Sequence, residues 1–317
     1  MGSNDFQNFL NGRNCLKIIC GAGNSDLREI TNLCALYAKA GCRFFDVNAS
    51  VEAVKAAKQG IKSAGAEKDC FICVSVGTKD DPHFIKCSID SSVCIGCGAC
   101  EKACPQTAIK NTNGIYSVIE EKCIGCGKCT NVCQQNAIRT HRLNYNLAKT
   151  LTELIQEGID CLEYHIITDD EENIMSGWVV ITKLYKGPIS VCSDRSKFGN
   201  EKVIRCLKKM KETCENLFIV QADGAPMSGG ENDYRTTLQA AAMADITEKA
   251  GITPYIFVSG GTNSKTKELL DLCNIDITGI SIGSYARKIV KKYIVDENLL
   301  TDKLLFEEGV EVAKTVV

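Results

Sequence analysis

Short apolar segments alternate with longer amphipathic segments along most of the chain, and this pattern predicts alternating strands and helices. Eight of the apolar segments are rich in β-branched or aromatic residues and have the length of buried strands. They cover Leu16–Gly21, Cys42–Val47, Phe71–Gly77, Cys161–Ile166, Pro188–Ser193, Leu217–Asp223, Tyr255–Gly261 and Ile277–Gly283. The helical segments cover 26–40, 50–64, 143–157, 170–185, 200–214, 234–250, 264–273 and 285–294.

Eight strand–helix pairs in this order predict a parallel sheet that closes on itself. Residues 80–140 break the alternation, and removing these 61 residues from 317 leaves 256, close to the ~250 of a (β/α)₈ barrel. We therefore predict an α/β fold in which residues 1–79 and 141–317 form a TIM-like (β/α)₈ barrel. Residues 80–140 are then an inserted domain after strand 3. An open, doubly wound sheet is the alternative fold.

Polar side chains recur near the C-terminal ends of several predicted strands. Asp46, Glu163, His165 and Asp223 alternate with apolar neighbours, and Asp194 directly follows the fifth strand. In a barrel, the apolar face of each strand contacts the helices and the other face points inward. Active sites of this fold lie at the C-terminal ends of the strands. These five residues are therefore candidate catalytic residues. His165 is the best proton carrier near neutral pH, and a structural role in the core is its alternative.

Small residues end the last two predicted strands. In this fold the loops after strands 7 and 8 frequently bind phosphate through free backbone amides. We therefore expect a phosphate-bearing ligand such as FMN there, and tight turns without a ligand are the alternative. The candidate binding residues are Ser259, Gly260, Gly261, Gly283, Ser284 and Arg287.

The chain has 20 cysteines in 317 residues and a formal charge of −2. The first residues contain neither a basic n-region nor an apolar h-region, so we expect a cytoplasmic location and free thiols. A charge near zero gives no reason to expect nucleic acid as a partner. No apolar run reaches the ~18 residues that span a bilayer, so we expect no transmembrane segment.

Eight of the cysteines form two runs with the same spacing. The run from Cys94 to Cys104 follows the pattern C-x₂-C-x₂-C-x₃-C and precedes Pro105, and the run from Cys123 to Cys133 repeats it with Gln134 in place of the proline. Three thiolates of one tight loop bind three corners of a cubane, and the fourth thiolate comes from the other run. This predicts two [4Fe–4S] clusters, and zinc is an alternative that the spacing explains poorly. One cluster is expected on Cys94, Cys97, Cys100 and Cys133, and the other on Cys104, Cys123, Cys126 and Cys129.

Two segments outside these runs are further candidates. His83, at the entry to the insertion, is a candidate contact to a cluster or ligand. Residues 223–232 follow the sixth strand and are long and Gly-rich, so they are predicted to form a lid over the barrel mouth. A plain surface loop is the alternative for this segment.

Residues 90–140 resemble the bacterial two-cluster ferredoxin module, with a predicted hairpin that turns at Asn113-Gly114. The whole chain resembles the light-dependent period family, cyanobacterial iron–sulfur proteins linked to redox input to the circadian clock. The segments that carry this resemblance are 16–22, 81–84, 223–229, 260–263 and 283–288. The resemblance implies redox sensing or electron transfer, with a redox partner protein or a small electron carrier, and it does not imply a clock here. An enzyme is the alternative: a ferredoxin-fused barrel oxidoreductase acting on or with a phosphate-bearing ligand such as FMN.

Overall fold

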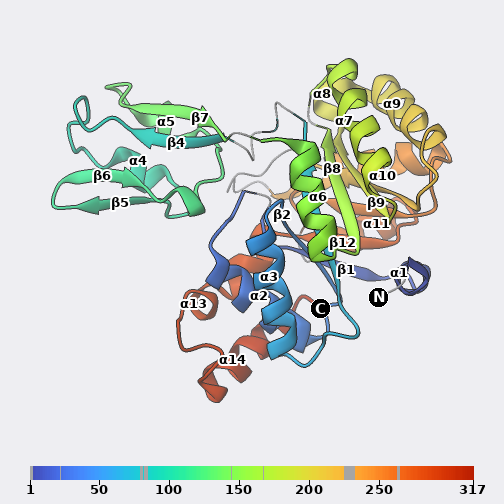
Figure 1. Ribbon diagram of the computed structural model, residues 1–317, viewed down its shortest axis with the longest axis horizontal. Helices are drawn as coiled ribbons and strands as arrows, with labels where there is room; N and C mark the ends of the chain where they lie inside the picture. Colours follow the sequence, from blue (N-terminus) through green and yellow to red (C-terminus); the bar gives the residue numbers. More distant parts are fainter. Residues whose placement is uncertain are drawn as a thin grey trace.

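Eight parallel strands form a closed barrel in the computed structural model (Figure 1), which describes residues 3–21, 23–78, 81, 85–143, 145–166, 168–224, 233–262 and 265–317. Around the barrel the strands follow the order β1-β12-β11-β10-β9-β8-β3-β2. The predicted (β/α)₈ fold is confirmed, and the open sheet is wrong. The strands are β1 (Cys15–Ile19), β2 (Phe44–Asn48), β3 (Phe71–Gly77), β8 (Cys161–Ile166), β9 (Ile189–Asp194), β10 (Phe218–Asp223), β11 (Ile256–Ser259) and β12 (Gly279–Ile282).

Helices surround the barrel on its outer side (Figure 1). Seven of the eight predicted helices are present as single helices, whereas the segment 285–294 forms two short ones, α12 (Ser284–Ile289) and α13 (Lys291–Ile294). The sequence pattern missed the short α8 (Arg195–Phe198) and α14 (Lys303–Lys314). No described helix is both long enough and apolar enough to cross a bilayer. The seven are α2 (Leu27–Ala40), α3 (Val51–Ser63), α6 (Leu147–Glu157), α7 (Glu171–Leu184), α9 (Asn200–Glu212), α10 (Asp233–Lys249) and α11 (Thr266–Leu272).

The apolar faces of the strands point outward and pack against the helices, as predicted. Leu162, Tyr164 and Ile166 of β8 are fully buried and belong to one large cluster with Trp178 of α7. A second cluster covers the opposite part of the barrel, between the outer faces of β1 to β3 and helices α2 and α3. Full burial of one such side chain stabilises the fold by about 1.5–3 kcal/mol. Most of the stabilising apolar area therefore lies outside the ring of strands.

The N-terminal end of the barrel is closed by helix α1 (Ser3–Asn11), which was not predicted. Phe6 and Leu10 are 1% and 0% exposed. The Phe6 ring lies 5.0 Å from the Phe44 ring and 4.9 Å from the Phe71 ring, between centroids. The inward residues at this end are apolar, so the opening of the barrel is at the C-terminal ends of the strands.

The insertion between β3 and β8 forms a separate lobe, called here the insert lobe (residues 85–142; Figure 1). Its ends pair as antiparallel strands β4 (Ile85–Ile89) and β7 (Ile138–Arg142). The hairpin of β5 (Ile109–Thr112) and β6 (Ile115–Val118) turns at Asn113 and Gly114 with φ of 53° and 85°, as predicted. The short helices of the lobe are α4 (Ala99–Ala103), η2 (Glu120–Lys122) and α5 (Lys128–Val132). The insertion after strand 3 is confirmed, while the boundaries at 80 and 140 stay a prediction.

Candidate functional site

Two pockets in the insert lobe are lined by the two predicted sets of four cysteines. We call the first the proximal pocket: Cys104, Cys123, Cys126 and Cys129 line it. The distal pocket is lined by Cys94, Cys97, Cys100 and Cys133. In each set, three cysteines come from one run and one comes from the other, as in two-cluster ferredoxins. The donor sets fit [4Fe–4S] clusters, and the assignment of each ligand remains a prediction.

The loops that carry the thiols have backbone conformations set by glycine. Gly98 and Gly127 begin the helices α4 and α5 with φ of 73° and 72°. A Cβ at Gly98 would lie 2.9 Å from the Tyr116 hydroxyl, so the close approach also requires glycine. After each run the chain turns back and donates an amide to its last cysteine: Ala108 N lies 3.3 Å from Cys104 Sγ, and Ala137 N lies 3.3 Å from Cys133 Sγ. Amide–sulfur bonds stabilise thiolates and tune cluster potentials.

A fifth thiol lines the proximal pocket. Cys87 on β4 is 4% exposed, and its Sγ lies 3.8 Å from Cys129 Sγ. The hydrogen bond from Cys87 lowers the pKa of Cys123 to about 5, against the opposing effect of burial. The sequence pattern missed this residue because Cys87 lies outside both runs and shares their pocket only through the pairing of β4 with β7.

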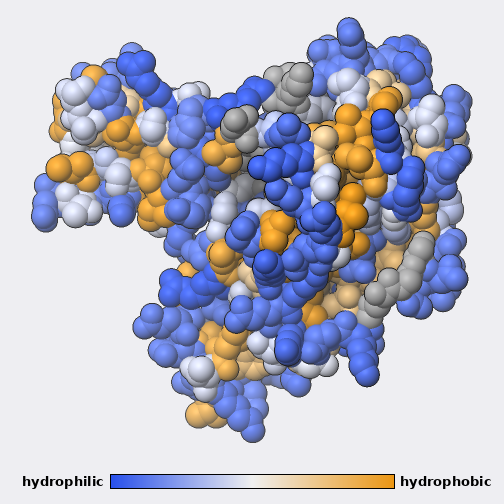
Figure 2. Space-filling model, in the orientation of Figure 1, coloured by the Kyte–Doolittle hydropathy of each residue, from blue (hydrophilic) through white to orange (hydrophobic). Residues whose placement is uncertain are grey.

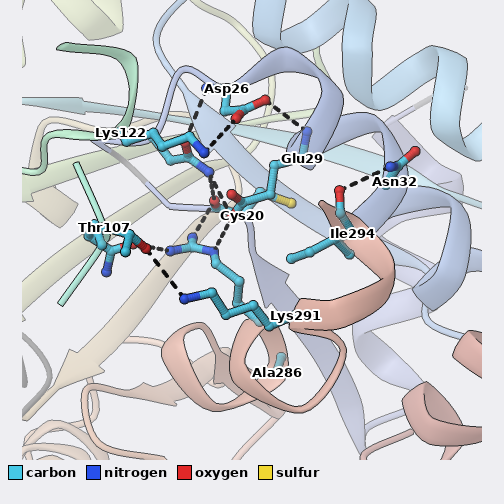
Figure 3. Close-up of polar contacts among 12 residues, drawn as sticks. Cys20, Asp26, Glu29, Asn32, Thr107, Lys122, Ala286, Lys291 and Ile294 are labelled. Carbon is cyan, nitrogen blue, oxygen red and sulfur yellow. Dashed lines mark hydrogen bonds and ion pairs between the residues drawn. The ribbon is translucent and has the colours of Figure 1, made fainter. Parts of the chain in front are cut away.

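The proximal pocket lies next to the barrel mouth, as the contacts between the lobe and the β1–α2 loop show. Ser25 N donates to Glu121 O at 2.8 Å, and the Lys122 ammonium lies 3.6 Å from Asp26 (Figure 3). Lys86 Nζ donates to Gly23 O at 3.0 Å and to Cys123 O at 2.6 Å. The lobe therefore contacts the barrel through its second cysteine run, as expected for an insertion over the mouth.

Helix α12 and the first residue of α13 make a second set of contacts with the lobe. The Arg287 guanidinium lies 3.1 Å from Glu29, donates to Cys20 O at 2.5 Å and to Gln106 at 3.3 Å. Lys291 reaches Thr107 at 3.4 Å (Figure 3). Arg287, a predicted phosphate ligand, thus bridges the barrel and the insert lobe, and its guanidinium is engaged by these partners.

A buried polar network fills the middle of the barrel, above the apolar layer that α1 closes. Lys17 of β1 is 1% exposed, and its ammonium lies 2.5 Å from Glu163 and 4.0 Å from Asp46. Gln221 donates to Glu163 at 2.7 Å, and Ser190 donates to it at 2.9 Å. Glu163 and Asp46, two predicted catalytic residues, therefore belong to one network on the inward face.

His165 connects this network to the barrel mouth. Its Nε2 lies 3.1 Å from Glu163 and its Nδ1 lies 3.4 Å from Asp81. A Cβ at Gly77 would overlap the Asp81 carboxylate, so only glycine at the end of β3 leaves room for this contact. Burial alone lowers the pKa of His165, but the hydrogen bonds with Asp81 and Glu163 outweigh it and raise this pKa well above 6.5.

The charges of the network shift the pKa values of its carboxyl groups in opposite directions. Burial favours the protonated form of Glu163, but Lys17 and His165 outweigh it and lower its pKa. For Asp46, burial outweighs the attraction of Lys17 and raises the pKa to about 6. Burial also raises the pKa of Asp223 to about 6, while His165 opposes the shift. One carboxyl group inside the barrel and one at its mouth thus have a raised pKa, which is typical of proton-transfer sites.

Asp194 and Asp223 lie opposite one another at the ends of β9 and β10. Ser259 pairs with Asp223 at the end of the next strand, so three predicted site residues share one side of the mouth. Gly260 and Gly261 have φ of 72° and 80°, and a Cβ at Gly260 would lie 2.5 Å from the Asp223 carboxylate. Gly283 and Ser284 directly follow the neighbouring strand β12 and begin α12. The two candidate phosphate loops, which follow β11 and β12, therefore begin at neighbouring strands, and the Asp223 carboxylate lies next to the loop after β11.

Glu163, His165 and Cys192 bring a carboxylate, an imidazole and a thiol within 4.8 Å of one another. This set is the only group of three such donors found among the described residues. Because the Lys17 ammonium already neutralises Glu163, the arrangement favours proton transfer over metal binding. His83 and residues 225–232, the remainder of the predicted lid, lie outside the described residues.

Lys17, Gln221 and Lys86 are the main residues that the sequence pattern missed. Lys17 interrupts the apolar run Leu16–Ile19 at an inward position, which was a usable signal. Gln221 alternates with apolar neighbours in the same way. Lys86 carried no signal, because a lysine in a short strand is ordinarily exposed.

Comparisons with known proteins identify both parts of the chain. A model of the light dependent period A C-terminal domain matches residues 153–315, just over half of the chain, and a 4Fe-4S dicluster domain model matches residues 87–140. Light dependent period A of Synechococcus elongatus is 28% identical over 287 residues, covering 86% of this chain and 79% of that protein.

Solved barrel structures are similar at low identity. Tryptophan synthase from M. tuberculosis has a TM-score of 0.48 at 10% identity, covering 98% of both chains. The YdjI aldolase from Escherichia coli has a TM-score of 0.47 at 8% identity, covering 99% of this chain and 92% of that chain. These values say nothing about function. On the family match and the dicluster domain, the chain belongs to the light-dependent period A family and is an iron–sulfur protein.

Proposed function

We propose that this iron–sulfur protein transfers or senses electrons through two [4Fe–4S] clusters, one in each pocket of the insert lobe. The observation that carries the proposal is the division of the eight spaced cysteines between two pockets, four in each. The spacing C-x₂-C-x₂-C-x₃-C, present twice, is that of cluster-binding runs, and zinc sites explain it poorly. None of the twenty cysteines, all of which lie among the described residues, forms a disulfide, which agrees with a reducing, cytoplasmic location.

The distal pocket supports exchange with a redox partner protein or a small electron carrier. Cys97 is exposed, and Ile95, two residues before it in the loop, is 66% exposed. Apolar side chains reach the surface of the insert lobe, at the left of Figure 2. Val93 and Val132 are also partly exposed, at 40% and 39%. An exposed cluster edge with apolar surroundings suits transient docking.

Metal analysis and one variant test this proposal. Anaerobically purified protein should contain about eight iron and eight sulfide per chain. Cys104→Ala should damage the cluster of Cys123, Cys126 and Cys129, although Cys104 belongs to the other run. Loss of the signal of the distal cluster instead would overturn the crossed assignment, and zinc in place of iron would overturn the proposal itself.

The second candidate function is an oxidoreductase whose barrel binds a phosphate-bearing ligand such as FMN. The observation that favours it is the buried network of Lys17, Glu163 and His165, which reaches Asp81 at the barrel mouth. Such a network supplies proton transfer that an electron carrier alone does not require. Asp46, Asp194 and Asp223 would then surround the reacting part of the ligand.

Flavin analysis and ligand binding separate the two candidates. If the barrel is an enzyme, the purified protein should contain flavin or be stabilised by FMN in a thermal-shift assay. Gly261→Val and Gly283→Val should abolish that stabilisation and leave the iron content unchanged. If neither flavin nor another phosphorylated metabolite binds in a thermal-shift screen, the enzyme candidate loses its support and the electron-transfer proposal stands.

A further inference from the structure

Lys86 is a buried lysine at the junction between the insert lobe and the barrel. It is 3% exposed, and its Nζ donates to the backbone carbonyls of Cys123 and Gly23. Among the residues that the structure describes, no carboxylate forms an ion pair with Lys86. A buried ammonium is costly unless hydrogen-bond acceptors and a negative charge lie beside it.

Negative charge acts on Lys86 from Cys123, which lines the proximal pocket, and from the Glu120 and Glu121 carboxylates, neither of which forms an ion pair with it. Cys123, whose carbonyl accepts the hydrogen bond, is one of the four predicted ligands in the proximal pocket, and Cys87, the next residue on β4 after Lys86, lines the same pocket. A [4Fe–4S] cluster with four thiolate ligands is anionic in its oxidised form and gains one further negative charge on reduction. A buried positive charge beside it therefore stabilises the reduced form more than the oxidised form.

We propose that Lys86 is the counter-charge of the proximal cluster and holds its reduction potential above the value that the cluster has without this lysine. The inference rests on the proposed function, because it requires a cluster in the proximal pocket. It gives the two clusters different roles. The proximal cluster accepts the electron more readily and lies against the barrel, while the distal cluster faces solvent.

The lysine that we compare with Lys86 on the side of the distal pocket is exposed instead of buried. Lys102 lies between Cys100 and Cys104 in sequence, but its side chain is exposed. Water and salt screen a charge at such a position. The equivalent charge therefore has less effect on the distal cluster, and Lys102 offers a matched control of the same chemical type.

The contact with Gly23 ties the ammonium to the barrel as well as to the cluster loop. Gly23 is buried in the β1–α2 loop, and a Cβ there would lie 3.2 Å from Ile124 Cα, so the two backbones are in close contact. Because the Gly23 carbonyl fixes the position of Nζ, the barrel holds the positive charge against the pocket. Lys86 is thus a positioning residue for electron transfer at the barrel mouth.

Redox titration of the whole protein, followed by EPR under anaerobic conditions, tests the proposal. Lys86→Met should shift the midpoint potential of the proximal cluster downward and leave that of the distal cluster unchanged. Lys86→Arg should restore most of the shift, and Lys102→Met should change neither potential by a comparable amount. Cys97→Ala, which removes a predicted ligand of the distal cluster, assigns the two signals. Iron and sulfide are measured for every variant.

Each outcome separates this inference from the proposed function. A wild-type protein without clusters would overturn the proposed function itself. Lys86→Met with full iron content and unchanged potentials would overturn only the role of Lys86. If Lys86→Met does not assemble the proximal cluster, Lys86→Arg decides: a restored cluster supports a counter-charge. Failure of Lys86→Arg as well would show that side-chain shape, and not charge, is required.

Discussion

The insert lobe and the barrel interior both gather chemically active side chains, but they do so in different ways. In the lobe, two runs of eleven residues supply eight thiols, and the spacing within each run places three of them in one pocket. In the barrel, Lys17 and Glu163 meet across 146 residues of sequence. The thiols of the lobe are close in sequence and are expected to bind a cofactor, whereas the charged pair of the barrel is brought together by the fold alone.

This difference also concerns stability. The core of the lobe consists of eight buried residues, and four of them are Cys87, Cys100, Cys123 and Cys129. The barrel is stabilised by two large apolar clusters and by the aromatic layer under α1. We therefore expect the lobe to depend on iron for its folding and the barrel to fold without it.

Removal of iron should have the largest effect. After anaerobic chelation, amides in 85–142 should lose protection from hydrogen exchange by ~10-fold or more, because the thiol-lined pockets lose the metal that joins them. Mass spectrometry of peptides measures this directly. Amides of the barrel strands should keep their protection, as in a control chain with 80–140 replaced by a Gly/Ser linker. Equal loss in both parts would mean that the lobe and the barrel unfold as one unit.

Lys17→Met should destabilise the barrel by about 3–5 kcal/mol, because it leaves Glu163 charged and buried without its partner. The free energy of unfolding by denaturant gives the value, and the iron content should equal that of the wild type. The double variant Lys17→Met/Glu163→Gln should be more stable than the single variant, since it removes the unpaired charge. A single variant as stable as the wild type would contradict the importance of this ion pair.

The pH dependence of the free energy of unfolding should show how much protonated His165 stabilises the fold. Its pKa is raised in the folded protein, so protonated His165 stabilises the fold fully below its ordinary pKa of 6.5. This contribution is lost as the pH rises through the folded-state pKa. The difference in stability between the wild type and His165→Gln should therefore be largest near pH 6 and decrease toward alkaline pH. A difference that is constant across this range would show that the imidazole does not titrate within the network.

Cys87→Ala should have the smallest effect. The side chain is small and, in our assignment, is not a ligand, so we expect a loss of at most about 1 kcal/mol. Iron content should stay at about eight per chain. Cys129→Ala is the matched control, and it should lose the EPR signal of the proximal cluster. Equal iron loss in both variants would make Cys87 a ligand.

The sequence predicted most of the barrel because strands and helices repeat with clear periods of hydrophobicity. All eight strands lie where the apolar runs placed them, and the inward face of β8 was identified from Glu163 and His165. Helices α1 and α14 lie outside the eight strand–helix pairs, so the repeat gave no reason to expect them. The eighth helix breaks after Ile289 into two short helices, which its continuous apolar pattern did not indicate.

The functional site was predictable only where its residues are close in sequence. The spacing within each cysteine run places three of its thiols in one pocket. In contrast, the partners of Glu163 come from β1, β8, β9 and β10. The junction had no sequence signal, because contacts such as Ser25 with Glu121 join surfaces that are both polar. These contacts depend on which distant segments of the chain lie together in the fold. The hydrophobic periodicity within one segment does not show this.

The antiparallel pairing of β4 with β7 also bears on how the barrel closes during folding. β3 and β8 are neighbours in the barrel but are separated in the chain by the whole insertion. The entropy lost on joining two chain positions grows with the length of the loop between them, by about 0.6 kcal/mol for each doubling. When Ile85 pairs with Arg142, the part of the chain that still separates β3 from β8 shrinks to residues 78–84 and 143–160, which include α6. A lobe that folds first thus gives β3 a nearby partner and shortens the time during which its edge is open to other chains.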